Sequence, residues 1–239
     1  MSNTQPSQLM PKNTSVVILS AGHGTRMMPL TKNTPKPLLK VGQYSLIEHH
    51  LLRLNRLGFQ QIVINIAYLG EQIRNTLGDG SQYGLSIEYS DEAETGALET
   101  AGGLKAALPL IQSDPFLVIN ADIWTDYDFS QLLNPLEKQV RLVMVENPPH
   151  NPKGDFSISE DALLSNNNKD KLTFSGIGLY QKSVFNELKD GKQALAPVFR
   201  SLIEQGEIEG VTIDSQWQDI GTPERLEAIN RAYEKLNKR

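Results

Sequence analysis

The stretch LSAGHGTRMMPLTKNTPKP, residues 19–37, is the main guide to the expected fold of this chain. It begins at the end of an apolar run, residues 16–19, which is typical of a short buried strand. A turn containing Gly22 and Gly24 follows directly. Glycine lets backbone N–H groups approach an anion because no Cβ intervenes, and concave rows of such amides bind phosphate. The sequence therefore predicts a strand that ends in an anion-binding loop.

Two cations follow the glycine turn. Arg26 carries a planar fork of donors, and Lys36, which stands between two prolines, carries a compact point charge. A strand, a glycine turn and two cations so close together indicate a polyphosphate site. The alternative is an ordinary strand–turn–helix junction whose cations only face solvent.

Composition narrows the classes of function. The chain has 239 residues, a net charge of −5 and no cysteine. The mixed charges indicate neither a nucleic-acid nor a membrane partner, and no apolar run approaches the length of a membrane span. The lack of cysteine excludes disulfides, zinc–thiolate sites and a thiol nucleophile, and it fits a cytoplasmic protein. We expect a disordered lead-in over residues 1–14 and a single domain over residues 15–239.

Apolar runs alternate with helical patterns along the chain, which favours an α/β fold with a mostly parallel sheet and helices on both faces. Strands are expected at residues 16–19, 62–66, 85–89, 116–119, 140–145, 172–180 and 211–213. Helices are expected at residues 45–57, 69–77, 100–110, 198–203 and 223–236.

Two aspartates have positions that suit a ligand site. Asp122 follows a buried strand directly, and ligands of parallel sheets bind beyond the carboxyl ends of the strands. Asp219 precedes a glycine turn and a helix start. Carboxylates at such places often hold Mg²⁺. For Asp219 taken alone, a helix or turn cap is an equally good interpretation.

The run 19–37 is similar to the G-x-G-T-R-[ML]-x-P-L-T…P-K-P signature of the sugar-phosphate nucleotidyltransferases, the enzymes that make NDP-sugars. The distinctive positions are present at Ala21, Gly22, Gly24, Thr25, Arg26, Pro29, Leu30, Thr31, Pro35, Lys36 and Pro37. The resemblance implies a GT-A-like fold with a Rossmann-like mixed sheet. It also implies an Mg²⁺-dependent enzyme, with a nucleotide-binding half over about residues 15–130 and a sugar-binding half over about residues 131–239.

The resemblance further implies roles for individual residues. Arg26 and Lys36 would be catalytic, and Asp122 and Asp219, the latter in a W-x-D-x-G-T-P segment, would hold the Mg²⁺. The segment GALETAGG, residues 96–103, resembles the L-G-T-A-G segment that contacts the nucleobase and ribose, although Glu99 replaces the commoner glycine. The nucleotide would then contact Ala21, Gly22, Gly24, Thr25, Arg26, Lys36, Thr100 and Gly102.

Three residues are candidates for contact with the sugar. Asn120 offers donor and acceptor groups beside the expected metal site, and Gly176 lies on a later strand where glycine permits close approach of a ligand or of backbone. Asp155 could accept hydrogen bonds from the sugar or be a solvated loop charge. The acidic, glycine-containing loop 91–97 is a candidate lid.

The segments ENPPHNPKGDF, residues 146–156, and IWTDYDF, residues 123–129, are similar to one branch of the family. That branch transfers uridylyl from UTP to N-acetylmuramic acid α-1-phosphate in peptidoglycan recycling. The alternatives are a transferase for glucose 1-phosphate or mannose 1-phosphate that uses dTTP or GTP, and a non-catalytic nucleotide-sugar sensor. A dinucleotide-binding oxidoreductase is disfavoured, because the third glycine of G-x-G-x-x-G is missing after Gly24.

Overall fold

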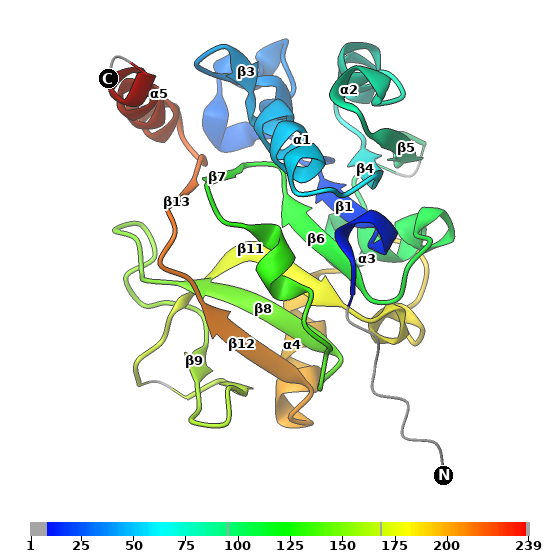
Figure 1. Ribbon diagram of the computed structural model, residues 1–239, viewed down its shortest axis with the longest axis vertical. Helices are drawn as coiled ribbons and strands as arrows, with labels where there is room; N and C mark the ends of the chain where they lie inside the picture. Colours follow the sequence, from blue (N-terminus) through cyan, green and yellow to red (C-terminus); the bar gives the residue numbers. More distant parts are fainter. Residues whose placement is uncertain (1–8, 95, 168, 238–239) are drawn as a thin grey trace.

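The computed structural model describes residues 9–94, 96–167 and 169–237, and a seven-stranded sheet lies at its centre (Figure 1). Strands β1, β4, β5 and β6 are parallel to one another, as are β8 and β12. Strand β11 runs antiparallel to both of its neighbours, β6 and β8. In spatial order the strands are β12 (Ile208–Thr212), β8 (Val140–Val145), β11 (Thr173–Tyr180), β6 (Phe116–Asn120), β1 (Val16–Leu19), β4 (Gln61–Ile66) and β5 (Ser86–Asp91).

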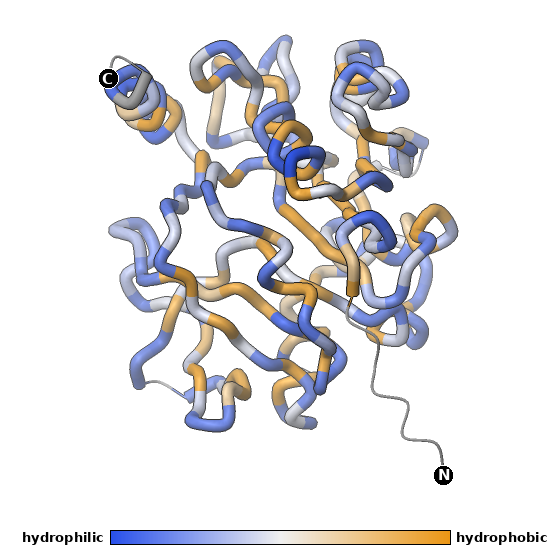
Figure 2. Tube along the Cα trace, in the orientation of Figure 1, coloured by the Kyte–Doolittle hydropathy of each residue, from blue (hydrophilic) through white to orange (hydrophobic). Residues whose placement is uncertain are grey.

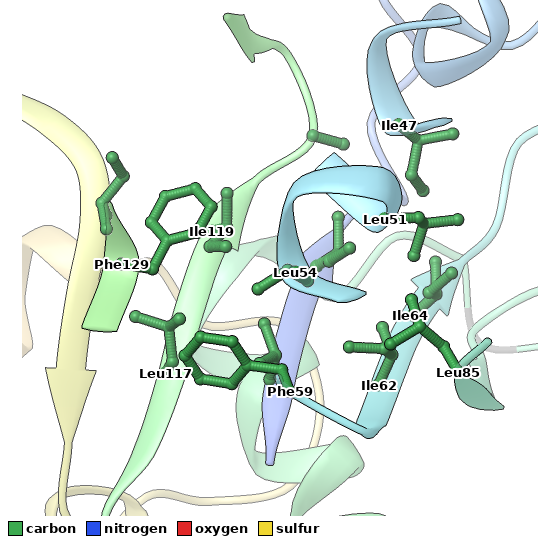
Figure 3. Close-up of a cluster of buried hydrophobic side chains, with 14 of the residues drawn as sticks. Ile47, Leu51, Leu54, Phe59, Ile62, Ile64, Leu85, Leu117, Ile119 and Phe129 are labelled. Atoms are coloured by element: carbon green, nitrogen blue, oxygen red, sulfur yellow. The ribbon is translucent and has the colours of Figure 1, made fainter. Parts of the chain in front are cut away.

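Helices cover both faces of the sheet because its strands are apolar on both sides. Val16 and Ile18 of β1 pack into one buried cluster with helix α1, whereas Val17, which points the other way, packs with α3 and α4. Figure 3 shows the first cluster, and Figure 2 shows that hydrophobic positions concentrate along the strands. The helices are α1 (Leu46–Arg56), α2 (Gly70–Leu77), α3 (Glu99–Ala107), α4 (Leu195–Glu204) and α5 (Pro223–Asn237). The predicted α/β fold class is confirmed.

In the part of the chain that the structure describes, three short strand pairs lie outside the main sheet: β2 (Lys40–Val41) with β3 (Tyr44–Ser45), β9 (Ser157–Ile158) with β10 (Leu164–Ser165), and β7 (Ile123–Thr125) with β13 (Trp217–Asp219). The sequence did not predict them, since strands of two or three residues are too short to show a period. Short 3-10 helices complete the connections at Pro11–Asn13, Thr25–Met27, Leu30–Lys32, Lys36–Leu38, Ser81–Tyr83, Leu108–Leu110, Phe129–Leu132 and Lys182–Phe185.

The structure differs from the expected disordered lead-in at residues 9–14. These residues contain the 3-10 helix Pro11–Asn13, and the Thr14 hydroxyl donates to the Met10 carbonyl at 3.0 Å. Leu9 packs against the first core cluster, which gives this segment an apolar anchor. Residues 1–8 of the predicted lead-in lie outside the described residues.

The strand predicted at residues 211–213 starts three residues earlier, at Ile208. The earlier start follows from parallel backbone pairing with β8, in which Ile208 lies opposite Val140 and which sequence periodicity does not reveal. Across this pair, Arg141 lies 2.7 Å from Glu209. None of the helices in the described ranges is both long enough and apolar enough to cross a membrane.

Candidate functional site

Two cavities lie at the carboxyl ends of the central strands and share a wall. The first, of about 380 Å³, is lined by the loop after β1, and the second, of about 510 Å³, by β11 and α4. Leu19, Glu99, Thr100 and Asn120 line both cavities. The first cavity collects these predicted nucleotide-site residues: Ala21, Gly22, Gly24, Thr25, Arg26, Lys36 and Thr100. The second contains all three predicted sugar-contact residues, Asn120, Asp155 and Gly176.

The predicted phosphate loop, residues 20–27 and called the phosphate loop below, takes its shape from the residues packed beneath it. Gly24 has a φ of 63°, which favours glycine, and its carbonyl accepts a hydrogen bond from the Thr31 hydroxyl at 2.9 Å. A Cβ at Gly24 would lie 3.0 Å from Thr31 Cγ2 and 3.2 Å from Lys36 Cβ. The buried Met27 anchors the end of the loop, while Arg26 is exposed at the cavity. The spacing between Gly24, Thr31 and Lys36 in the signature therefore follows from the way these residues pack against one another.

Lys36 joins the phosphate loop to the end of β6. Its side chain is largely buried, and Nζ lies 2.5 Å from Asp122 Oδ2. Asp122 follows β6 and is held by backbone pairing, because its carbonyl accepts the Ile220 amide at 2.8 Å. In the adjoining β7–β13 pair, Ile123 lies opposite Asp219. The two predicted metal ligands, far apart in sequence, thus lie on neighbouring backbone positions.

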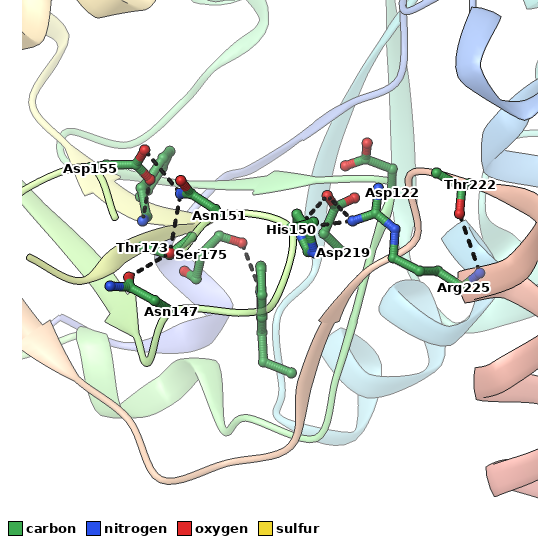
Figure 4. A network of polar contacts seen from close by, with 12 residues as sticks. Asp122, Asn147, His150, Asn151, Asp155, Thr173, Ser175, Asp219, Thr222 and Arg225 are labelled. Atoms are coloured by element: carbon green, nitrogen blue, oxygen red, sulfur yellow. Dashed lines mark hydrogen bonds and ion pairs between the residues drawn. The ribbon is translucent and has the colours of Figure 1, made fainter. Parts of the chain in front are cut away.

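Asp219 is engaged by two further groups (Figure 4). Its Oδ2 accepts a hydrogen bond from Arg225 Nη1 at 2.8 Å and lies 3.3 Å from His150 Nε2. Within the described ranges no three His, Asp or Glu residues gather in a way that could hold a metal. The donor set still fits Mg²⁺, which takes one or two carboxylates together with substrate phosphates and water. Both carboxylates are also partly exposed.

The second cavity is walled by aromatic rings. The rings of Phe174 and Phe199 meet edge to face with centroids 5.7 Å apart, and Phe156 and Tyr180 complete the wall. Asp155 lines this cavity, but its Oδ2 already accepts the Phe174 amide at 2.8 Å, so it also holds its loop against β11.

Gly176 has a φ of 81°, and a Cβ there would lie 2.6 Å from Asn120 Nδ2. The glycine thus admits the Asn120 side chain, which lies on the wall shared by the two cavities.

Gly102, two residues after Thr100, is not among the residues that line the two cavities. It is buried in α3, its amide donates to the Gln193 carbonyl at 3.1 Å, and a Cβ would collide with the Gly191 carbonyl. Its observed contacts are therefore with the segment 191–193. Residue 95 of the predicted lid loop lies outside the described residues, and Ala97 of that loop lines the first cavity.

Sequence reasoning missed Asn65 and Glu92, which also line the first cavity. Both are buried, with exposed fractions of 3% and 1%. Asn65 is next to the last residue of β4, and Glu92 follows β5 directly. The signal that identified Asp122, a polar residue at the carboxyl end of a parallel strand, would have found both.

A buried histidine lies beneath the Asp122 turn. His50 of α1 is 2% exposed and makes a hydrogen bond to the backbone of Ile123, while its Nε2 has no hydrogen-bond partner within the described structure. Burial lowers the pKa of His50 to about 4, so the ring is neutral near pH 7. It supports the turn by packing and one hydrogen bond rather than by charge.

Comparisons with known proteins show the family. A family model described as nucleotidyl transferase matches residues 15–161. The N-acetylmuramate alpha-1-phosphate uridylyltransferase of Neisseria meningitidis is 49% identical over 88% of this chain and 94% of its own length. That of Caulobacter vibrioides is 30% identical over 87% and 92%.

A solved structure of a putative glucose-1-phosphate thymidylyltransferase from Bacillus anthracis aligns with a TM-score of 0.77 at 22% identity. The alignment covers 92% of this chain and 95% of that one, and it shows the shared fold. With its signature loop at the end of β1 and its family match over most of the chain, this protein belongs to the nucleotidyl transferase family.

Proposed function

We propose that the protein transfers uridylyl from UTP to N-acetylmuramic acid α-1-phosphate, giving UDP-N-acetylmuramic acid and pyrophosphate in peptidoglycan recycling. The observation that carries this proposal is the 49% identity, nearly end to end, with a protein of that name. The two joined cavities support it, because one suits a nucleoside triphosphate and the other a sugar phosphate. We further propose that the reaction takes place in the cytoplasm, because a chain without cysteine needs no oxidising compartment for disulfides.

The reaction is an in-line displacement. A phosphate oxygen of the sugar 1-phosphate attacks the α-phosphorus of UTP, the bond from that phosphorus to the bridging oxygen of the β-phosphate breaks, and pyrophosphate leaves. Such chemistry needs positioning and charge stabilisation and no protein nucleophile. In this proposal, the reacting phosphates meet at the shared wall, near Thr100 and Asn120. The two halves of the chain, residues 15–130 and 131–239, would then hold the nucleotide and face the sugar.

Charged residues supply the stabilisation. Arg26, with the amides of Gly24 and Thr25, would hold the departing β- and γ-phosphates, and Ala21 and Gly22 would line their path. Lys36 would contact the reacting phosphates, since its ammonium already lies at the cavity wall beside Asp122. Thr100, at the start of α3, would contact the nucleoside, and Gly102 would act through the segment packed against it.

Asp122 and Asp219 would hold Mg²⁺, which neutralises phosphate charge when bound. In the structure these carboxylates are paired with Lys36 and with Arg225 and His150. An ion taken up by the carboxylates would leave Lys36 and Arg225 free to contact phosphate oxygens. Before substrate binds, the two aspartates therefore hold the positive charges of Lys36 and Arg225 in place for the phosphates.

A transferase for glucose 1-phosphate or mannose 1-phosphate is the second candidate. Mannose-1-phosphate guanylyltransferases, such as the 29% identical Drosophila melanogaster subunit, match over 88% of this chain. Nucleobase and sugar choice depend on a few contacts, so the family alone does not discriminate.

Pyrophosphate release by the full chain, measured with each sugar 1-phosphate in combination with UTP, dTTP and GTP, tests the proposal. We expect release with N-acetylmuramic acid α-1-phosphate and UTP in the presence of Mg²⁺, and loss of activity on chelation with EDTA that added Mg²⁺ restores. Turnover confined to glucose 1-phosphate with dTTP, or to mannose 1-phosphate with GTP, would overturn the assignment.

A further inference from the structure

A chain of buried hydrogen bonds connects the two segments expected to contact the nucleotide, the phosphate loop and the segment 96–103. The Ser20 amide donates to Asn65 Oδ1 at 2.6 Å, and Asn65 Nδ2 donates to Glu92 Oε1 at 2.8 Å. The Leu98 amide then donates to Glu92 Oε2 at 2.8 Å. Two side chains at the carboxyl ends of the neighbouring parallel strands β4 and β5 thus connect the first residue of the phosphate loop to the residue just before α3.

The polarity of this chain is fixed at both ends. A backbone amide can only donate, so the Asn65 atom that faces Ser20 must be oxygen, and the NH₂ group of Asn65 must then face Glu92. At the other end, the Leu98 amide requires an acceptor, which the Glu92 carboxylate supplies. Each side chain is therefore the correct partner only while the other keeps its identity.

The residue that packs over Asn65 and Glu92 must be a glycine for a steric reason. Gly103 lies in α3, and a Cβ there would lie 2.6 Å from Glu92 Oε1 and 2.9 Å from Asn65 Nδ2. Any larger residue would push the pair away from the helix. The glycine allows α3 to lie directly on the two side chains and so couples its N-terminus to them.

We propose that Asn65 and Glu92 are positioning residues that hold the phosphate loop and segment 96–103 at the spacing required by one bound nucleotide. Both line the first cavity, and both are almost fully buried. Asn65 acts through Ser20 and Glu92 acts through Leu98, so the pair sets nucleotide affinity rather than the chemical step. The proposal depends on the proposed function only for the choice of UTP as the nucleotide.

A swap of the two side-chain chemistries tests this. In Glu92→Gln, the carboxamide cannot satisfy both Leu98 and Asn65 without turning an NH₂ group toward a donor. In Asn65→Asp, two carboxylates face each other. The double variant Asn65→Asp/Glu92→Gln restores every bond in the chain with the same shapes and the same net charge. Its carboxamide at position 92 donates to the new carboxylate at position 65 and still accepts from the Leu98 amide.

We expect each single variant to raise the KM for UTP roughly tenfold, as for a buried polar group left without its partner, with the KM for the sugar 1-phosphate changed less than about twofold. The double variant should return the KM for UTP to within about threefold of the original chain. Glu88→Gln, the same charge change at an exposed position of β5, is the matched control and should have no effect.

Gly103→Ala is a second route if a single variant fails to fold. It removes no polar group and adds a residue that favours helix, yet its Cβ would displace the pair. It should also raise the KM for UTP selectively. Direct titration of UTP onto the full chain without sugar phosphate provides the same comparison for binding alone.

Two results would overturn the proposal: a double variant no better than the worse single variant, or equal losses for both substrates together with a lowered Tm, as a purely structural role would give. If the enzyme turns over with a different nucleotide, the same variants are measured with that nucleotide. The proposed substrate would then be wrong while the positioning role is still tested.

Discussion

The two cavities of this protein are lined by different kinds of residue. The first lies among loops that follow parallel strands and is lined by charged and amide groups such as Arg26, Lys36 and Asp122. The second lies between β11 and α4 and is walled by aromatic rings and small residues. Charge in the first cavity would place phosphates, whereas the shape of the second would select a sugar. On this proposal, reaction type and substrate choice depend on separate cavities of the fold.

Removal of charge from the first cavity should have the largest effect. Lys36→Ala deletes the buried ammonium that lies 2.5 Å from Asp122, so we expect the kcat for pyrophosphate release to fall on the order of 100-fold or more. Steady-state kinetics with both substrates measures it.

Lys32→Ala, a nearby lysine that is exposed, is the matched control and should keep its rate. A Lys36→Ala enzyme with near-normal turnover would contradict the proposal that positive charge in the first cavity stabilises the reacting phosphates.

The pH dependence of the free energy of unfolding tests a buried residue, His50, that supports the first cavity and has no counterpart in our account of the second. His50 packs under the Asp122 turn with a pKa lowered by burial to about 4, whereas in the unfolded chain its pKa is about 6.5. The unfolded state therefore binds the proton more readily, and this contribution to stability is lost as the pH falls from about 6.5 toward 4. We expect about 2 kcal/mol less free energy of unfolding at pH 5 than at pH 7 from this residue, by urea denaturation.

His50→Asn keeps a side-chain amide near Ile123 and removes the titrating ring. The difference between its stabilities at pH 7 and pH 5 should be smaller than that of the original chain by most of that amount. Equal pH dependence in the two proteins would show that the pKa of His50 in the folded protein is not lowered.

The smallest expected effect tests the wall that the cavities share. In Gly176→Ala, a Cβ would lie 2.6 Å from Asn120 Nδ2 at a position with a φ of 81°. We expect the KM for the sugar 1-phosphate to rise about tenfold, since Asn120 would be displaced at the second cavity, with a smaller change for UTP.

Gly206→Ala separates this contact from backbone strain. Gly206 also has a positive φ, of 69°, but among the described residues its Cβ would meet only a Leu163 carbon at 4.0 Å. This variant should lose a similar amount of stability and keep both KM values. A rise in the sugar-phosphate KM in Gly206→Ala as well would mean that strain, and not Asn120, causes the effect.

Much of the first cavity could be predicted from sequence, since many of its lining residues lie in the single run 19–37, whose glycines and cations have recognisable spacing. The predicted strands that carry it match β1, β4 and β6 within a residue. The chain of hydrogen bonds from Ser20 through Asn65 to Glu92 could not be predicted, because each side chain comes from a different segment. Arg225 and His150 at Asp219 were missed for the same reason.

The α/β alternation, the glycine loop at residues 20–27 and the family could all be identified from the sequence, because they depend on patterns within short windows of chain. The three-dimensional structure was needed to show that Asp122 and Asp219 lie on neighbouring backbone positions and that Gly102 packs against residues 191–193. It was also needed to place Asn120 between the two cavities. Strand pairing brings distant residues together at one edge of the sheet, and no local spacing encodes which ones meet.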